Sequence, residues 1–426
     1  MNFSIFRLKI SECCKIIPVL AVLLAFSTTT RAQGDLPVIY SGVVLDNGSG
    51  DELAGATLSV LGTNISTITN SEGYFQLRLA EDMPKAKIEI SLLGYENLIV
   101  ILSNFTKSNN IIKLRPVNQL DEISISAIDV QELMRKVFAN RRENYMDDNT
   151  LMTAFYRESI KRRNTNVSLA EAVVFIDKRP YYSLQNDRVS LYKARKSTDY
   201  SRLDTIALKL QGGPLNALFI DVIKYPDYFM DETSLAYYDF ELEAPTVLNG
   251  DTTHVVSFKH KTNIIDPLYY GRIYIHQATN ALTNAVFSLD VSNRQMASEL
   301  FVKKKPKKVK VYPTTINYKV DYKSKDGKWF LSKSAAQLDF VVNWRRKIFN
   351  TKYQVNCEMF VNDWKKVADI SDFDQAQRFK SGAILADEAS GFSDPNFWGA
   401  YNVIEPDESI ERAIEKIKAK LNELTQ

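Results

Sequence analysis

A run of lysines is the strongest charge feature of this chain, and its chemistry is the binding of anions. Pro306 interrupts the run, and proline lacks the N–H that a central strand donates, so we expect a hairpin turn or a sheet edge here. Exposed lysines can contact lipid head groups or lipopolysaccharide phosphates, each contributing about 1 kcal/mol near a charged surface. The alternative is a solvated hairpin tip whose charges prevent edge aggregation. The candidate residues for contact with an anionic surface are Lys303, Lys304, Lys305, Lys307, Lys308 and Lys310.

The three histidines do not form the ligand set of a zinc enzyme. A zinc carboxypeptidase holds its metal with a His-x-x-Glu pair and a distant histidine. None of His254, His260 and His276 has a glutamate three residues later. His254 and His260 flank one predicted strand, where they would line a polar rim. We therefore predict no metal site and no cofactor.

Neither the cysteine nor the carboxylates form a recognisable catalytic group. Cys357 lies in an apolar stripe of period two, where a buried, inert thiol is expected, because a reactive cysteine needs exposure and a polarising neighbour. Glu158, Glu171 and Asp239 are acidic, but no spacing marks them as an acid–base pair. We therefore predict no catalytic residues and a protein that is not an enzyme.

The first 32 residues resemble a secretory signal peptide. Arg7, Lys9 and Lys15 precede an apolar core of about eleven residues from Ile16 to Phe26, which is short for a membrane span. The alternative is an N-terminal membrane anchor. Cysteines 13 and 14 precede the apolar core, so they do not form a lipoprotein acylation site. We predict export to the periplasm or association with the outer membrane.

The composition is that of a folded globular protein. Hydrophobic residues make up 45% and charged residues 25% of the chain. The net charge of +3 is too small to indicate a nucleic-acid partner. The aromatic content of 11% favours β structure. Removal of the signal would leave Cys357 alone, so no intramolecular disulfide is expected.

Residues 36–126 are predicted to form a small β-sandwich. Apolar residues alternate in short runs, such as Leu58 and Val60, then Tyr74 (or Phe75) and Leu77, as is typical of half-buried strands. Polar clusters rich in glycine, asparagine and aspartate separate them at 46–51 and 70–73, as expected for turns. Frequent turns between short strands favour an antiparallel sandwich.

The same stretch resembles the carboxypeptidase regulatory-like domain, which has a transthyretin-like fold. The family usually has Asp where this chain has Asn70. This domain also precedes the plug and barrel of TonB-dependent outer-membrane receptors, where a segment like Leu120–Ile125 follows it. No plug or barrel is recognisable here. The resemblance is carried by Gly42-x-Val44-x-Asp46, Leu53-x-Gly55-Ala56, Val60-x-Gly62-Thr63, Thr69-Asn70-x-x-Gly73-x-Phe75 and Gly94-Tyr95.

The remainder is predicted to be a larger β domain with a few helices. Residues 127–148 form a linker helix, because Asp129 and Glu132 make a capping box before an apolar face. Residues 149–370 contain about ten alternating strands of an antiparallel curved sheet or half-barrel. Some strand pairs resemble those of outer-membrane lipoprotein-carrier proteins. Residues 371–426 are a C-terminal segment with a terminal amphipathic helix that docks on the sheet or binds a partner.

These observations predict a mainly β protein of the Gram-negative envelope. We expect a non-enzymatic protein that binds a protein, lipid or glycan at the periplasmic side of the outer membrane, with the sandwich as docking module. The partner would be an envelope protein, such as a TonB-dependent receptor, or lipid, with peripheral outer-membrane contact. Two alternatives are a lipid or lipoprotein carrier with an apolar cavity and a hydrolase with an unrecognised site.

Overall fold

The computed structural model describes residues 37–117, 128–163, 165–198, 212–248, 250–262, 264–302, 307–345, 349–368, 378–391, 397–407, 410 and 414. Residues Pro37–Gln426 cluster as one compact unit. Four predicted features lie outside the described residues, wholly or mostly. They are the signal peptide, the 120–125 segment, Lys303 to Lys305 and the terminal helix. No helix in the described ranges is long and apolar enough to cross a membrane.

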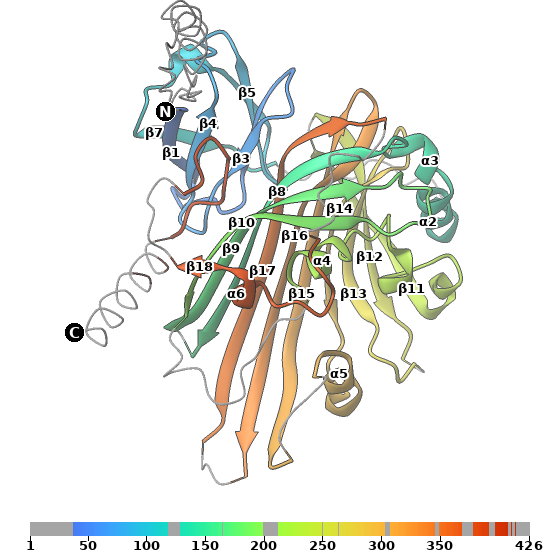
Figure 1. Ribbon diagram of the computed structural model, residues 1–426. Helices are drawn as coiled ribbons and strands as arrows, with labels where there is room; N and C mark the ends of the chain where they lie inside the picture. The colour runs from blue at the N-terminus through green and yellow to red at the C-terminus, as the bar shows by residue number, and fades with distance from the viewer. Residues whose placement is uncertain are drawn as a thin grey trace, which may run out of the picture. The chain divides into compact units, whose positions relative to one another are not determined.

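The N-terminal part is the predicted sandwich of two small sheets (Figure 1). Strand β1 (Val38–Asp46) is antiparallel to β4 (Tyr74–Leu79) and parallel to β7 (Asn110–Leu114). Burial alternates along β1, β4 and β7, and the inward side chains of both sheets form one core around Leu58, Phe75 and Ile90. One sheet contains β4 (Tyr74–Leu79), β1 (Val38–Asp46) and β7 (Asn110–Leu114), and the other contains β3 (Ser66–Ile68), β2 (Thr57–Val60), β5 (Lys87–Ser91) and β6 (Leu98–Ile101), which the short helix η1 (Leu102–Asn104) follows.

The turn before β4 shows how the sandwich tolerates Asn70 in place of aspartate. The Asn70 Oδ1 atom accepts hydrogen bonds from the backbone N–H groups of Glu72 (3.0 Å) and Tyr74 (2.9 Å). An amide oxygen does this as well as a carboxylate does. Gly73 has a φ of +67°, and a Cβ atom there would lie 2.6 Å from the Val44 carbonyl oxygen, so the turn requires glycine.

The second part is one large open sheet of eleven strands. Ten are antiparallel to their neighbours, and the two-residue strand β18 pairs in parallel with β10. The prediction of an antiparallel sheet of about this size is confirmed. In spatial order the strands are β11 (Tyr238–Leu248), β12 (Asp251–His260), β13 (Tyr269–His276), β14 (Leu282–Leu289), β15 (Val309–Lys325), β16 (Lys328–Trp344), β17 (Thr351–Lys366), β8 (Thr150–Arg162), β9 (Thr165–Lys178), β10 (Arg188–Thr198) and β18 (Ser390–Gly391).

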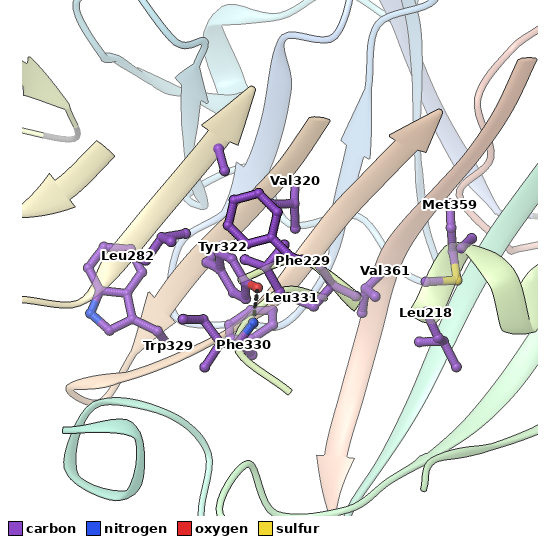
Figure 2. Packing of buried hydrophobic residues seen from close by; sticks show 14 of the residues in the cluster. Leu218, Phe229, Leu282, Val320, Tyr322, Trp329, Phe330, Leu331, Met359 and Val361 are labelled. Atoms are coloured by element: carbon purple, nitrogen blue, oxygen red, sulfur yellow. Dashed lines mark hydrogen bonds between the residues drawn. The ribbon is translucent and has the colours of Figure 1, made fainter. Parts of the chain in front are cut away.

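One face of this sheet, which we call the inner face, carries the main hydrophobic core. Tyr322, Leu331 and Met359 belong to it from three strands, and Leu218 and Phe229 of the 212–237 segment pack in the same cluster (Figure 2). The predicted linker helix is α2, and Asp129 caps it by accepting a bond of 3.1 Å from the Glu132 N–H. The helices on the chain segments that cover this face are α2 (Val130–Ala139), α3 (Arg141–Asn144), α4 (Gly213–Leu218), η2 (Pro226–Tyr228), η3 (Ser234–Tyr237) and α6 (Leu385–Glu388).

The strands from β15 to β9 extend beyond the rest of the sheet (Figure 1). A second apolar cluster, which includes Ile160, Val342 and Val355, lies on this extension. Strand β14 pairs with β15 only over Asn317–Asp321, so the earlier half of β15 is not paired with it. Helix α5 (Arg294–Phe301) packs against β15 and protects this edge from association with other strands.

Replacement of Gly42 by alanine tests the close parallel pairing of β1 and β7. A Cβ atom at Gly42 would lie 2.2 Å from the Asn110 carbonyl oxygen, so the strands must separate. We expect Gly42→Ala to lower the free energy of unfolding by about 1–3 kcal/mol in urea denaturation. Gly382→Ala is the matched control, because a Cβ atom there meets no atom within 4 Å. Equal stability of the two variants would contradict the tight β1–β7 contact.

Candidate functional site

The described residues beside three chain connections meet at the free end of the long strands. The connections join α5 to β15, β16 to β17, and β8 to β9. The Arg345 N–H donates a bond of 3.2 Å to the Lys308 carbonyl oxygen, and the Arg163 N–H donates one of 3.0 Å to the Lys352 carbonyl oxygen. Tyr353 also pairs with Arg162 across β17 and β8. The sheet therefore brings together segments that are almost 200 residues apart in the sequence.

These connections concentrate positive charge. Residues 159–168 contain three Lys or Arg residues, residues 302–316 contain six and residues 340–355 contain four, whereas none of these stretches contains Asp or Glu. The whole chain has a net charge of only +3, so this end is strongly basic against a remainder that is acidic. We define the basic hairpin end by its described residues, Lys161, Arg162, Arg163, Lys307, Lys308, Lys310, Arg345 and Lys352.

Most of this charge faces solvent. Lys307, Lys308, Lys310 and Arg345 are exposed, as are Arg163 and Lys352. The first acidic residue reached along β16 from Arg345 is Asp339. Like charges held this close without carboxylates produce a local positive potential that attracts anions. The structure thus places three of the six predicted lysines, at 307, 308 and 310, in a larger basic group, and the other three lie outside the described residues.

Sequence reasoning missed the basic residues at the ends of β8 and β16 and at the start of β17. Arg163, Arg345 and Lys352 lie far from the lysine run, and only strand pairing brings them to it. A usable signal was present in the sequence, because none of the three basic stretches contains an acidic residue.

A buried ionic network fills part of the inner face. Lys178 is 1% exposed, and its Nζ atom donates bonds of 2.7 Å to carboxylate oxygens of both Asp187 and Asp221. The Tyr322 hydroxyl donates a bond of 2.7 Å to Asp221 Oδ1. Burial alone would lower the pKa of Lys178, but the two carboxylates outweigh it and raise that pKa. Since the charges are paired with one another, the network attaches the 212–237 segment to the sheet and is not a reactive site.

A second ionic cluster lies on the opposite, outer face. The Arg157 Nε atom donates a bond of 2.7 Å to Glu171, and Arg195 binds the other oxygen of that carboxylate at 2.8 Å. Arg157 also donates to the Ile404 carbonyl oxygen, and the Arg195 guanidinium lies 4.6 Å from the Trp398 ring centre. These contacts hold residues 397–407 on the sheet.

Residues 397–407 also bind the sandwich. The Asn402 side chain accepts a bond of 2.8 Å from the Arg78 N–H and donates one of 3.0 Å to the Arg78 carbonyl oxygen, as a neighbouring strand would. Arg78 forms an ion pair of 2.6 Å with Glu405. Ile68 of the sandwich joins Phe155 and Trp398 in one apolar cluster. The segment therefore couples the sandwich to the sheet.

A cleft of about 440 Å³ lies where β2 and the following turn face the ends of β15 and β16. Lys323 contacts Ser59 across it, and the Lys325 Nζ atom donates a bond of 2.5 Å to Asn64. Burial lowers the pKa of Lys323 to about 8. The Lys319 ammonium lies 3.4 Å from Asp321, so the lining carries charges of both signs. The cleft is a polar junction, and its lining has no charge that selects one class of ligand.

The remaining candidates of the sequence do not converge on a site. His260 binds Asp290 at 3.0 Å and His276 lies 3.4 Å from Asp251, each as a separate pair. No group of three or more potential metal ligands occurs in the described parts of the chain. Burial raises the pKa of the Cys357 thiol to about 12, which suppresses the nucleophilic thiolate.

The three carboxylates considered for hydrolysis are also separated. Glu158 points to the inner face beside Tyr156, whereas Glu171 belongs to the outer ionic cluster and Asp239 is exposed on the edge strand β11. Neighbouring strands pair Arg157 with Glu171, so Glu158 is on the other side of the sheet. Their geometry does not form an acid–base pair.

Comparison with known proteins identifies the sandwich. Residues 40–125 match the model of the CarboxypepD_reg-like domain, which confirms the resemblance predicted for this part of the chain. A search among curated proteins finds no significant match to the sequence.

Solved structures show only a loose likeness. A DUF1329 family protein from Desulfovibrio piger has 10% identity and a TM-score of 0.24, covering 58% of this chain and 99% of its own. A putative outer membrane lipoprotein-sorting protein domain from Vibrio parahaemolyticus has 11% identity and a TM-score of 0.25, covering 58% of this chain and 96% of its own. A putative membrane-associated protein of unknown function from Bacteroides fragilis has 11% identity and a TM-score of 0.16, covering 78% and 99%. Similarity at these TM-scores supports no inference about function.

Glu158 is expected to make stability depend on pH. Burial raises its pKa to about 7, although the Tyr156 hydroxyl donates a bond of 3.0 Å to it. Its folded pKa exceeds its unfolded value, so its contribution is present at low pH and is lost as pH rises through about 7. We expect Glu158→Gln to gain roughly 3 kcal/mol relative to the wild type between about pH 5 and pH 8.

Urea denaturation of both proteins across this range measures the difference. Glu232→Gln is the control, because Glu232 is exposed. Parallel pH profiles of the wild type and Glu158→Gln would show that Glu158 is ionised in the folded protein at neutral pH.

Proposed function

We propose that this protein is a non-enzymatic, exported envelope protein that binds a phosphate-bearing anionic surface through the basic hairpin end. The observation that carries the proposal is the convergence of three basic connections without a single acidic residue at one end of the sheet. Such a charge distribution binds anions without a catalytic group or a cofactor. The predicted signal peptide and the regulatory-like domain support a place at the periplasmic side of the outer membrane.

The strength of the interaction follows from the number of exposed charges. Each lysine or arginine near an anionic membrane contributes about 1 kcal/mol. The six exposed residues of the basic hairpin end together correspond to a dissociation constant on the order of tens of micromolar. Because these charges are exposed, binding should weaken steeply as the salt concentration rises.

The sandwich is proposed to dock a partner at the far end of the same strands. Lys310 lies at the start of β15, and Lys323 contacts Ser59 of the sandwich near its end. At about 3.3 Å per residue the two lysines are roughly 40 Å apart. A partner bound to the sandwich would thus be held at a set distance from the anionic surface. An envelope protein such as a TonB-dependent receptor is the proposed class of partner.

A lipid or lipoprotein carrier is the alternative function. It requires an apolar cavity, and the inner face is the place for it. Covering residues such as Leu218 and Phe229 contact the sheet there (Figure 2). We therefore propose the basic hairpin end as the place of lipid contact.

Reversal of three charges tests the proposal. The variant Lys307→Glu, Lys308→Glu and Lys310→Glu should bind vesicles rich in phosphatidylglycerol at least about 100-fold more weakly than the wild type in a sedimentation assay. The loss of three attractive charges alone corresponds to about 3 kcal/mol, and the three new negative charges add repulsion. The matched control reverses Lys85, Lys87 and Lys113, which are exposed on the sandwich.

Two results would contradict the proposal. One is equal binding by the wild type and the 307/308/310 variant. The other is a stoichiometric acyl chain found by native mass spectrometry in both the wild type and this variant purified from their envelope, which would favour the carrier function instead.

A further inference from the structure

An exposed aromatic side chain lies within the basic hairpin end. Phe349 is 76% exposed and belongs to the connection between β16 and β17, four residues after Arg345 and three before Lys352. A single exposed apolar residue is common on protein surfaces and alone indicates nothing. The position of Phe349 among the exposed cations of the basic hairpin end is the second observation, because cations beside an apolar side chain match the interface of an anionic bilayer.

We propose that Phe349 inserts into the acyl region of an anionic bilayer while the surrounding lysines and arginines bind the lipid phosphates. This inference rests on the proposed function and identifies its anionic surface as a membrane, as opposed to a soluble polyanion. A soluble polyanion would use the cations and leave the phenyl ring in water. A bilayer offers both the phosphates and, a few ångströms deeper, an apolar phase for the ring.

The geometry allows both contacts at once. A backbone hydrogen bond of 3.2 Å joins Arg345, which precedes the β16–β17 connection, to Lys308, which precedes β15. These two cations therefore share one end of the sheet with Phe349. Strands β16 and β17 pair in register from Lys333–Phe360 to Val342–Thr351, so the connection that follows is at the tip of this hairpin. No acidic residue between 340 and 355 would repel the lipid phosphates as the ring approaches.

The first experiment measures the contribution of the ring to affinity. Phe349→Ala should bind vesicles rich in phosphatidylglycerol about 10-fold more weakly than the wild type, because the buried apolar area is lost. The slope of affinity against salt concentration should not change, since no charge is removed. Binding to soluble polyphosphate should be equal for the two proteins.

The second experiment locates the ring. Phe349→Trp is added to vesicles whose phospholipids carry bromine in their acyl chains, and its fluorescence quenching is compared with that of the wild type, which contains four tryptophans. We expect additional quenching only in this variant. Leu184→Trp is the matched control: Leu184 is 97% exposed and follows the end of β9 that is distant from Arg163.

The outcomes separate this inference from the proposed function. Vesicle affinity that is unchanged in Phe349→Ala, together with no additional quenching of Phe349→Trp, would overturn insertion, while a loss of binding in the 307/308/310 variant would still support the anionic contact. Binding of the wild type to polyphosphate but not to vesicles would also overturn insertion. Equal vesicle binding by the wild type and the 307/308/310 variant would overturn the proposed function itself.

Discussion

Continuous antiparallel pairing of β15, β16 and β17 is the constraint on which the rest of the structure depends. These strands are 17, 17 and 16 residues long, and each pairs with its neighbour over most of its length. Antiparallel hairpins put successive connections at opposite ends. Consequently the connection between β15 and β16 lies beside the sandwich, and the one between β16 and β17 lies at the basic hairpin end.

Each face of the sheet holds its covering segment through a different ionic network. The inner face buries a large apolar core, and the Lys178 network satisfies the charges of the segment that covers it. The outer face uses the Arg157–Glu171 pair to hold residues 397–407, which in turn bind Arg78 of the sandwich. A buried charge is costly unless it is paired, so each network specifies one position for the segment it binds.

The positive charge of the basic hairpin end lowers the stability of the isolated protein. Like charges at this end repel one another and reduce the stability of the fold there. The extension is stabilised by its own apolar cluster, in which Tyr353 and Val355 are almost fully buried, and by α5 along the edge of β15. Strand edges that carry lysines also resist aggregation, so the residues proposed to contact an anionic surface also favour solubility.

The sequence by itself determined the sandwich, the antiparallel β class and three of the eight described residues of the basic hairpin end. Local signals are sufficient for these features, because a glycine turn, a period-two alternation or a lysine run each involves only a few neighbouring residues. Only the tertiary structure decided three other features. It bonds Asn402 to Arg78 and turns Glu158 and Glu171 to opposite faces. It also brings Arg163, Arg345 and Lys352 to the same end of the sheet as Lys308. The physical reason is that strand register joins residues far apart in the chain, and a shift of one residue would move every side chain to the other face.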